Sequence, residues 1–254
     1  MIVDSPILGD ISDKHYTVKI ADTEKQVINA LKLRYEIFYV ELDRNFKNDA
    51  TIDEDKFDKQ CHHLIVIDNN ENEIVGTYRL QTIEQAEKGF GFYSGTYFFL
   101  DGFPEDVLIN GFEVGRACIK QEHRNGRVLY LLWKGFAGYL QFYKKRYLFG
   151  NLGISIPNEE SAVAMYSQLI NEEFIHPSIQ LQPKKQFKCT LPLKNTNGNS
   201  LSATKASPLL QNYIDIGCAV CSKPAFHPDL KLLYIMILLD VHEISDKVRR
   251  LFFG

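Results

Sequence analysis

Residues 112–146 read FEVGRACIKQEHRNGRVLYLLWKGFAGYLQFYKKR, and this stretch indicates the fold class most clearly. The segment 112–120 has the pattern of a strand, 121–127 is a basic loop, and the apolar-rich residues 128–146 predict a long helix. A strand, a loop and a helix in this order are typical of an α/β protein, in which helices cross over the faces of a sheet.

The same patterns extend to both sides of this segment. Upstream, a strand is predicted at 15–21, and Thr23 with Gln26 forms a capping-box pattern that begins a helix over about 24–42. Strands at 63–68 and 74–82 are joined by a turn-rich segment into a hairpin. The downstream predictions are a strand at 147–155, a helix at 158–172, strands at 187–193 and 232–240, a helix at 208–216, and a basic helix from 246. The fold class is therefore predicted to be α/β, with a mixed sheet.

The composition is that of an ordinary globular protein. The chain has 254 residues, of which 45% are hydrophobic and 24% charged, which excludes a disordered or fibrous chain. There are 29 Lys and Arg against 32 Asp and Glu, without the basic excess expected of a nucleic-acid-binding protein. We expect one domain over 1–254, with a core at about 15–193, an exposed loop at 194–206 and a C-terminal extension at 207–254.

Cysteine usage and hydropathy predict a reduced, cytoplasmic protein. The five cysteines are scattered, and the first residues lack the basic and apolar regions of a secretory signal. The longest apolar run, 232–239, is far shorter than the roughly 20 residues that span a bilayer. The ending RRLFF at 249–253 leaves open a peripheral contact with the inner face of a membrane.

No metal or cofactor motif is present in the sequence. Cys218 and Cys221 have no second cysteine pair at zinc-ligand spacing, and the adjacent His62 and His63 would face opposite sides of a strand. Cys118 has the pattern of a core residue. Phosphate-loop, dinucleotide-binding, serine-hydrolase and zinc-protease motifs are missing. We therefore expect no bound metal and no bound cofactor.

Arg34 lies on the apolar face of the first helix, where a guanidinium is costly to bury unless carboxylates meet it. The alternative is an arginine that reaches solvent from the edge of the helix. The acidic segment 43–60 has six carboxylates and offers partners. That segment is also compatible with a solvated run of charges, with a calcium site or with a place for a substrate amine.

The strand in 112–120 carries an acidic residue, Glu113, and a basic residue, Arg116. Regular alternation would place Glu113 and Arg116 on opposite faces, but Gly115 between them is a candidate bulge that would re-aim one of the two. Arg79 lies in the strand at 74–82. Glu113 with an arginine is compatible with a catalytic base and its electrostatic partner, and equally with a structural ion pair.

Five segments together resemble one group of acyltransferases. They are LRYEIFYVE at 33–41, DEDKFD at 53–58, CHHLIV at 61–66, IVGTYRL at 74–80 and FEVGRACI at 112–119. This set is similar to the N-acyl amino acid synthases and ornithine-lipid (lyso-ornithine) N-acyltransferases of the GNAT superfamily, and more distantly to acyl-homoserine-lactone synthases. The segments 207–217, 219–226 and 238–240 also resemble the lipid-forming branch, so that the resemblance covers about 15–254.

The resemblance implies a GNAT-like acyltransferase fold and a long, often 3-hydroxylated, acyl chain moved from acyl carrier protein to the amine of a small amino acid such as glycine or ornithine. Glu113 matches the general base of the family. The residues that match the charged and aromatic network around the cleft, with a positioning role, are Arg34, Phe38, Asp55, Asp58, Arg79 and Arg116.

Two departures from the family pattern bear on the substrates. The usual pyrophosphate loop is only partly present in 121–128, with one glycine followed by Arg127, which favours an acyl carrier protein as donor over acyl coenzyme A. His227 and Tyr234 stand where relatives often have Asp, which suggests a neutral acceptor such as glycine.

A group of cations follows the strand at 112–120. Four of them are candidates for binding the carrier protein or its phosphopantetheine, namely Lys120, Arg124, Arg127 and Lys134. Lys144, Lys145 and Arg146 extend the group, which would suit an acidic carrier protein. The alternative is a plain solvated helix face.

Other functions remain open at this point. A signal synthase of the acyl-homoserine-lactone type would have the same fold, as would an acetyltransferase that uses coenzyme A. A catalytically idle module that binds fatty acyl chains would share the apolar cleft.

Overall fold

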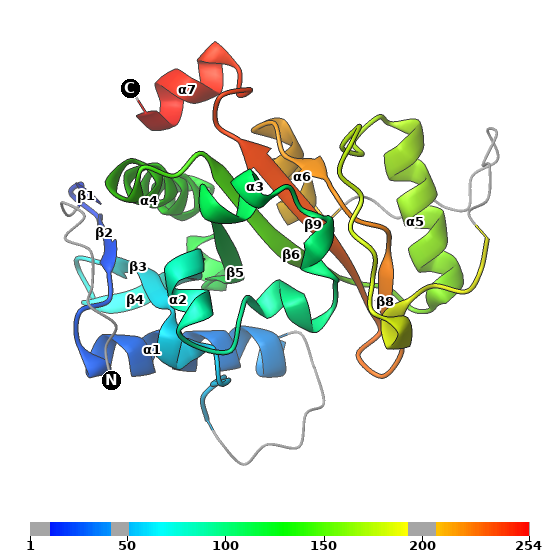
Figure 1. Cartoon of the computed structure of the whole chain (residues 1–254). Coiled ribbons are helices and arrows are strands. Elements are labelled where there is room, and N and C mark those ends of the chain that lie inside the picture. Colours follow the sequence, from blue (N-terminus) through cyan, green and yellow to red (C-terminus); the bar gives the residue numbers. More distant parts are fainter. Residues whose placement is uncertain (1–10, 42–50, 193–206, 254) are drawn as a thin grey trace. The chain divides into compact units, whose positions relative to one another are not determined.

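The computed structural model describes residues 11–41, 51–192 and 207–253 (Figure 1). The chain divides into two compact units. The first comprises Met1–Phe92, Phe112–Lys145 and Arg249–Gly254, and the second comprises Tyr93–Gly111 and Arg146–Val248. Both units combine strands with helices, so the predicted α/β class is confirmed. The predicted loop at 194–206 and the acids Asp43 and Asp49 lie outside the described residues.

The first unit contains an antiparallel sheet. Its strands pair in chain order: β1 (Ile11–Ser12), β2 (Tyr16–Ile20), β3 (His62–Asp68), β4 (Glu73–Thr82) and β5 (Gly111–Ile119). The predicted hairpin is confirmed as β3 and β4. In this sheet His63 stands opposite Arg79, which in turn stands opposite Gly115.

Two helices cover opposite faces of this sheet (Figure 1). Helix α1 (Glu24–Tyr35) packs Ala30 and Leu33 into a cluster with Ile65 of β3. Helix α4 (Arg127–Tyr143) packs on the other face, where a Cβ at Gly135 would lie 2.8 Å from the Leu64 side chain. Because neighbouring strand residues alternate in direction, Leu64 and Ile65 serve opposite faces.

The beginning of α1 follows the predicted capping chemistry. The Thr23 hydroxyl accepts a hydrogen bond from the Gln26 amide at 3.3 Å, and the Gln26 side chain accepts one from the backbone of Asp22 at 2.9 Å. The helix continues as a π-helix over Glu36–Glu41. The predicted helix at about 24–42 is therefore confirmed over 24–41, the part that the structure describes, and its last part widens from α to π geometry.

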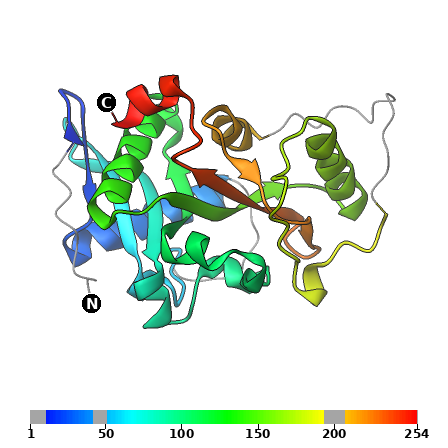
Figure 2. The same cartoon turned by 45° about the horizontal axis from the view of Figure 1, so that its top comes forward.

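The second unit is built on the strand pair β6 (Tyr147–Ser155) and β9 (Leu232–Asp240), which run antiparallel along their full length (Figure 2). Both strands have their predicted bounds. The short strands β7 (Ala219–Val220) and β8 (Ala225–His227) also pair with β9. The helices of this unit are α3 (Glu105–Ile109), α5 (Glu159–Asn171) and α6 (Pro208–Asp215).

The remaining helices are short. Helix α2 (Ile83–Glu87) follows β4, and α7 (Asp246–Phe253) ends the described chain. Phe252 of α7 packs on the Trp133 ring of α4, with 5.5 Å between ring centroids. Among the described residues, no helix is both long and apolar enough to cross a bilayer.

The strand predicted at 187–193 is wrong. Lys185–Phe187 is a turn of 3₁₀-helix, and in the part of the segment that the structure describes, pairing is limited to a single bridge between Lys188 and Ala225. A strand is stabilised by a partner of similar length, and Ala225 belongs to β8, which has only three residues.

Candidate active site

Arg34 is buried and meets two carboxylates. Its Nε donates to Asp53 Oδ2 at 2.7 Å, and its Nη1 donates to Asp58 Oδ1 at 2.6 Å. The side chain of Arg34 is 1% exposed, so the arginine does not reach solvent from the helix edge. The acidic segment thus supplies the partners that a buried guanidinium requires, as predicted.

The same carboxylates hold a second arginine. Arg79 of β4 is buried, and its Nη1 donates to Asp55 Oδ1 at 2.6 Å and to Asp58 Oδ1 at 3.0 Å. The backbone amide of Asp55 donates to Asp58 Oδ2 at 2.7 Å, which folds the acidic segment into a tight turn. Two residues that the chain places in separate elements, Arg34 and Arg79, therefore share Asp58.

A bulge in β5 adds a third arginine. Tyr78 of β4 stands opposite two residues of β5, Arg116 and Ala117, and Arg116 has a φ of +54°. The bulge follows Gly115 rather than lying at it, a correction of one residue to the prediction. Its effect is the predicted one, because it turns Arg116 toward the acidic segment, where Nη2 donates to Asp55 Oδ2 at 2.8 Å.

These contacts define the charge network, which consists of Arg34, Asp53, Asp55, Asp58, Arg79 and Arg116. Three guanidinium groups and three carboxylates balance one another. Exposure of the side chains rises across the network, from 2% for Asp58 to 22% for Asp55 and 21% for Arg116. The network therefore extends from the core to the edge of solvent.

Glu113 lies on the face of the sheet that carries the charge network. It stands opposite Gln81, and Gln81 shares a face with Arg79 because the two are two residues apart in one strand. Glu113 is 4% exposed. Two residues further along the same face, a Cβ at Gly115 would meet no heavy atom of the described residues within 4 Å. A buried carboxylate thus lies beside open space.

The pKa shifts of Asp55 and Asp58 argue against either of them acting as the general base. Burial raises the pKa of Asp58, but the Arg34 and Arg79 guanidinium groups outweigh it and hold that pKa well below its usual range. For Asp55, likewise, burial is outweighed by Arg79 and Arg116, and its pKa is lowered. Carboxylates held ionised in this way are poor proton acceptors at neutral pH, so these aspartates suit positioning.

Three contributors to this site were not among the predicted site residues. Asp53 accepts from Arg34 and also from the Tyr39 hydroxyl at 3.1 Å. His63 Nε2 lies 3.3 Å from the Asp58 carbonyl oxygen, and burial lowers its pKa to about 4. Sequence position could have indicated two of them. Asp53 lies in the same acidic segment as Asp55 and Asp58, and His63 lies opposite Arg79 in the predicted hairpin. No sequence signal marks Tyr39.

Phe38, a predicted site residue, is also brought to the network. It belongs to the π-helix that follows α1, and the Arg116 guanidinium carbon lies 5.8 Å from the centre of its ring. A cation at this distance from an aromatic face is attracted by the ring quadrupole. All six predicted network residues therefore lie together in the first unit.

The predicted carrier-binding cations are mostly paired with acids. Lys120 lies 2.7 Å from Glu73 Oε2, and Arg124 is held by Glu41 through two hydrogen bonds. Asp13 Oδ2 accepts from Arg127. Lys134 lies half-buried on α4. Of the cations that extend the group, Lys145 pairs with Glu84 and Arg146 with Asp240. The group is therefore less positive than the sequence alone indicates.

The remaining sequence predictions concern histidines and cysteines. His62 Nδ1 lies 2.8 Å from the Tyr139 hydroxyl of α4, so His62 and His63 serve opposite faces, as predicted. Cys118 is a core residue, also as predicted. Cys218 and Cys221 are buried, and burial raises the pKa of each thiol. Within the described ranges, no group of three or more His, Cys, Asp or Glu is arranged to hold a metal.

His227 and Tyr234, the departures in the tail, both join an aromatic cluster in the second unit. The Tyr97 hydroxyl donates to the Tyr234 hydroxyl at 3.2 Å, and the His227 ring lies 5.2 Å from Phe187, centroid to centroid. His227 thus contributes a ring to this cluster, and Tyr234 contributes a ring and a hydroxyl group.

Comparison with known proteins identifies the class. Residues 33–134 match the model of the acetyltransferase (GNAT) domain, a range that includes β5 and the first part of α4. The chain is 26% identical to the L-ornithine Nα-acyltransferase of Brucella abortus, over 96% of this chain and 90% of that protein. It is 35% identical to the L-ornithine Nα-acyltransferase of Agrobacterium fabrum, over 46% of this chain and 43% of that protein.

Solved structures show the same fold. The crystal structure of TofI with an inhibitor and MTA matches with a TM-score of 0.51 at 11% identity, covering 94% of this chain and 96% of that one. The AHL synthase LasI matches with a TM-score of 0.50 at 11% identity, covering 95% of this chain and 96% of that one. This chain is therefore an acyltransferase that matches the acetyltransferase (GNAT) domain over residues 33–134 and is similar to the L-ornithine Nα-acyltransferases along most of its length.

Proposed function

We propose that this chain is an N-acyltransferase that moves a long-chain fatty acyl group, 3-hydroxylated or not, from acyl carrier protein to the amine of a small amino acid. Glycine and ornithine are the candidate acceptors. Similarity to L-ornithine Nα-acyltransferases along almost the whole chain supports this assignment. The single observation that carries it is Glu113, a buried carboxylate beside the open space at Gly115.

Glu113 is the proposed general base. An amino acid carries its amine as an ammonium at neutral pH, and the ammonium must lose a proton to Glu113, directly or through a water, before it can attack. The free amine then attacks the thioester carbon, the new C–N bond forms, and the C–S bond breaks. The thiol of the carrier leaves with a proton, and the product is an amide.

The bulge in β5 serves the same step. A bulge interrupts the hydrogen-bond ladder, so strand amides near Arg116 are candidates for stabilising the negative oxygen that forms during attack. The charge network has a positioning role, because its three guanidinium groups and three carboxylates neutralise one another. It fixes the acidic segment next to the face that carries Glu113.

The proposed donor site lies at the beginning of α4. Gly126, with a φ of +85°, precedes the first turn of the helix, where backbone amides suit one phosphate. Lys120, Arg124, Arg127 and Lys134 would contact the carrier or its phosphopantetheine, and at least the first three would do so while shared with acids of this chain. We assign the reaction to the cytoplasm, with the basic end of α7 as a peripheral membrane contact.

Mass spectrometry of lipid extracts tests the proposal. Bacteria expressing the wild-type chain should accumulate an N-acylated amino acid, whose mass names both acceptor and acyl chain. The Glu113→Gln variant should lose this product by at least about 100-fold, as expected for removal of a general base. The matched control is Glu87→Gln, an exposed acid on α2 outside the proposed donor site, which should keep the product.

Two outcomes would overturn the proposal. Accumulation of a lactone without a linear acyl amino acid would assign the chain to signal synthesis. Full product in the Glu113→Gln variant would remove Glu113 from the reaction. Purified protein supplied with matched acyl carrier protein and acyl coenzyme A thioesters decides the donor.

A further inference from the structure

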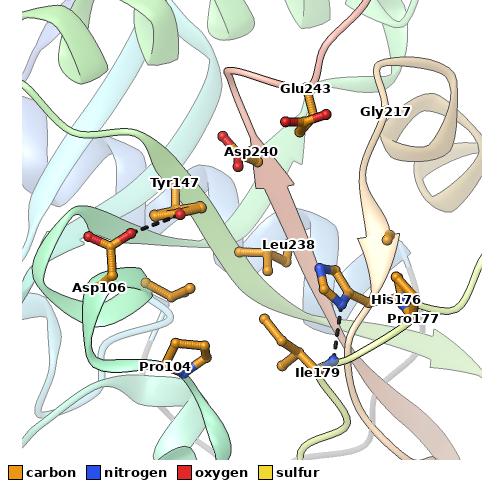
Figure 3. A pocket seen from close by; sticks show the side chains of 12 residues that line it. Pro104, Asp106, Tyr147, His176, Pro177, Ile179, Gly217, Leu238, Asp240 and Glu243 are labelled. Carbon is orange, nitrogen blue, oxygen red and sulfur yellow. Dashed lines mark hydrogen bonds between the residues drawn. The ribbon is translucent and has the colours of Figure 1, made fainter.

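Two acids in the second unit show how a carboxylate is fixed by several partners. Both line a cavity of about 450 Å³, together with a third acid and with apolar side chains (Figure 3). Asp240 accepts from Arg146 Nε at 2.9 Å and from the backbone amide two residues further on, also at 2.9 Å. Asp106 accepts from the Tyr147 hydroxyl at 2.9 Å and from the Asn110 side chain at 2.5 Å. Each of the two acids is thus bound to two residues of its own chain.

Glu41 in the first unit differs, because among the described residues its carboxylate accepts from Arg124 alone. Oε1 accepts from Arg124 Nη1 at 2.5 Å and Oε2 from Nη2 at 2.6 Å. These hydrogen bonds lower the pKa of Glu41, so the acid is ionised at neutral pH. The two side chains are 39% and 32% exposed, and ion pairs at such positions are weak. The Glu41 carboxylate can therefore leave Arg124 at little cost.

Arg124 has a second anchor that does not depend on Glu41. Its Nε donates to the carbonyl oxygen of Ile119, the last residue of β5, at 2.9 Å. Nη1 and Nη2 remain as a fork, and a guanidinium fork binds a carboxylate or a phosphate through the same two parallel hydrogen bonds. Arg124 lies three residues before the first residue of α4, in the loop of the proposed donor site. A fixed fork with a weakly held acid is suited to exchange one anion for another.

The other acids at the proposed donor site are less suited to such an exchange. Asp13 Oδ2 accepts from Arg127, but its Oδ1 also accepts from two backbone amides of its own turn, each at 2.7 Å. Glu73 pairs with Lys120, whose ammonium is a point charge without a fork. Glu41 is therefore the acid whose place a phosphate would take most readily.

The backbone next to Glu41 is held by other contacts. Glu41 ends the π-helix that follows α1, and in this π-helix the Tyr39 hydroxyl donates to Asp53 at 3.1 Å. The ring of Phe38 lies 5.8 Å from the Arg116 guanidinium carbon. The Glu41 side chain can therefore turn away from Arg124 while its backbone stays in place.

We propose that the Glu41 carboxylate occupies the place of the donor's phosphate in the free enzyme, and that the phosphate of the donor's pantetheine arm replaces it on Arg124. Glu41 thereby sets the affinity for the donor, because its pair with Arg124 must break at each binding event. The inference rests on the proposed function, in which the loop before α4 binds that phosphate. Carrier-bound phosphopantetheine and coenzyme A share the chemistry that is required, a phosphate attached to pantetheine.

Calorimetric titration of the full chain with 4′-phosphopantetheine, and with pantetheine, which lacks the phosphate, tests the exchange. Glu41→Gln should bind 4′-phosphopantetheine about threefold more tightly than the wild type, the size expected when a competing exposed ion pair is removed. Pantetheine should bind both proteins alike. A purely structural role for Glu41 predicts the opposite, because loss of a structural contact does not strengthen binding.

Two further variants separate the exchange from a change in overall charge. Glu36→Gln is the matched control, because Glu36 is an exposed acid of the same π-helix and makes no hydrogen bond to Arg124 in the part of the chain that the structure describes. It should leave the affinity unchanged. Arg124→Met should weaken 4′-phosphopantetheine, and adding Glu41→Gln to it should bring no gain, since no guanidinium remains to be released.

Titrations with holo-acyl carrier protein and with coenzyme A distinguish the two sources of the phosphate, since the true donor should bind more tightly to Glu41→Gln. The proposal is overturned if neither does so, if Glu36→Gln gains as much as Glu41→Gln, or if 4′-phosphopantetheine fails to bind at millimolar concentration. Normal lipid product in Glu41→Gln with unchanged donor affinity would overturn the exchange and leave the proposed function. Tighter binding without lipid product in the wild type would support the exchange and count against the acyl transfer.

Discussion

The charge network of the first unit and the cavity of the second use similar residues in opposite ways. In the network, each buried arginine meets aspartates, and the charges sum to zero. Three carboxylates line the cavity, and one of them, Asp240, is paired with Arg146. The three arginines and three aspartates of the network pair with one another. At the cavity, Asp240 is held by one guanidinium and Asp106 by the neutral side chains of Tyr147 and Asn110.

The largest predicted effect comes from breaking the network at its centre. Arg34→Met leaves Asp53 and Asp58 buried without their main cation, and we expect a loss of about 3–5 kcal/mol in the free energy of unfolding. Urea unfolding followed by the fluorescence of Trp133 reports on this unit, because Trp133 is the only tryptophan and belongs to it.

Arg124→Met is the control for this change. Its pair with Glu41 is partly exposed, at 39% and 32%, so the expected loss is at most about 1 kcal/mol. Equal losses in the two variants would mean that the buried ion pairs of Arg34 contribute no more to stability than the partly exposed pair of Arg124.

The second prediction concerns acid pH. Burial lowers the pKa of His63 to about 4 in the folded chain, against about 6.5 when unfolded, so the unfolded state takes up the proton first. Stability should be unaffected above pH 6.5 and should fall by up to about 3 kcal/mol as the pH drops to about 4. His63→Gln should flatten this part of the curve, measured by Trp133 fluorescence.

Below about pH 4, protonation of Asp55 and Asp58 determines the further loss of stability. The pKa values of Asp55 and Asp58 are lowered in the folded chain, so their contribution is complete above the ordinary aspartate pKa of about 3.9 and declines as the pH falls further. His63→Gln should retain this second decline. A variant that kept the loss between pH 6.5 and 4 would assign that loss to another group.

The third prediction tests the open space beside Glu113. Gly115→Leu would place a side chain in that space, and we expect the rate of acyl transfer to fall by about 100-fold, equivalent to about 2.7 kcal/mol. Because a Cβ there meets no described heavy atom within 4 Å, stability should change little. Product formation and urea unfolding are measured on the same samples, and normal activity of a folded variant would contradict the placement of the substrate.

Sequence reasoning succeeded where the signal was local. An arginine on an apolar helix face, with an acidic segment shortly after it, predicts the pairing of Arg34 with aspartates, because only carboxylates make such burial tolerable. The re-aiming of Arg116 follows from a glycine in the same strand. The strand at 232–240 was predicted with its bounds because it is an almost continuous apolar run. The strand at 147–155 was also predicted with its bounds, although Gly150, Asn151 and Gly153 interrupt its apolar residues.

Interactions between residues far apart in the chain could not be predicted from the sequence. Lys120, Arg124 and Arg127 appear in the sequence as a basic group, but their acids come from Glu73, Glu41 and Asp13, which no spacing links to them. The cavity could not be predicted for the same reason, since five separate segments form its walls. The strand predicted at 187–193 has a suitable pattern, but in its described part, 187–192, it has no partner of its length among the described residues.

The smallest predicted effect concerns the cavity wall. Gly217 ends the turn after α6 with a φ of +99°, a conformation that costs an alanine roughly 1–2 kcal/mol. A Cβ at Gly217 would meet its nearest neighbours at 3.9 Å, which is ordinary contact, so the cost of Gly217→Ala is conformational strain alone. Urea unfolding followed by circular dichroism should show a loss of this size.

Gly115→Ala is the matched comparison in the first unit. Its backbone φ is not in the left-handed region and its Cβ would have free space, so we expect a change within about 0.5 kcal/mol. Similar losses in the two variants would mean that the left-handed φ of Gly217 does not set the cost of its substitution. A loss confined to Gly217→Ala would mean that the left-handed backbone at Gly217, and not the absence of a side chain, requires glycine there.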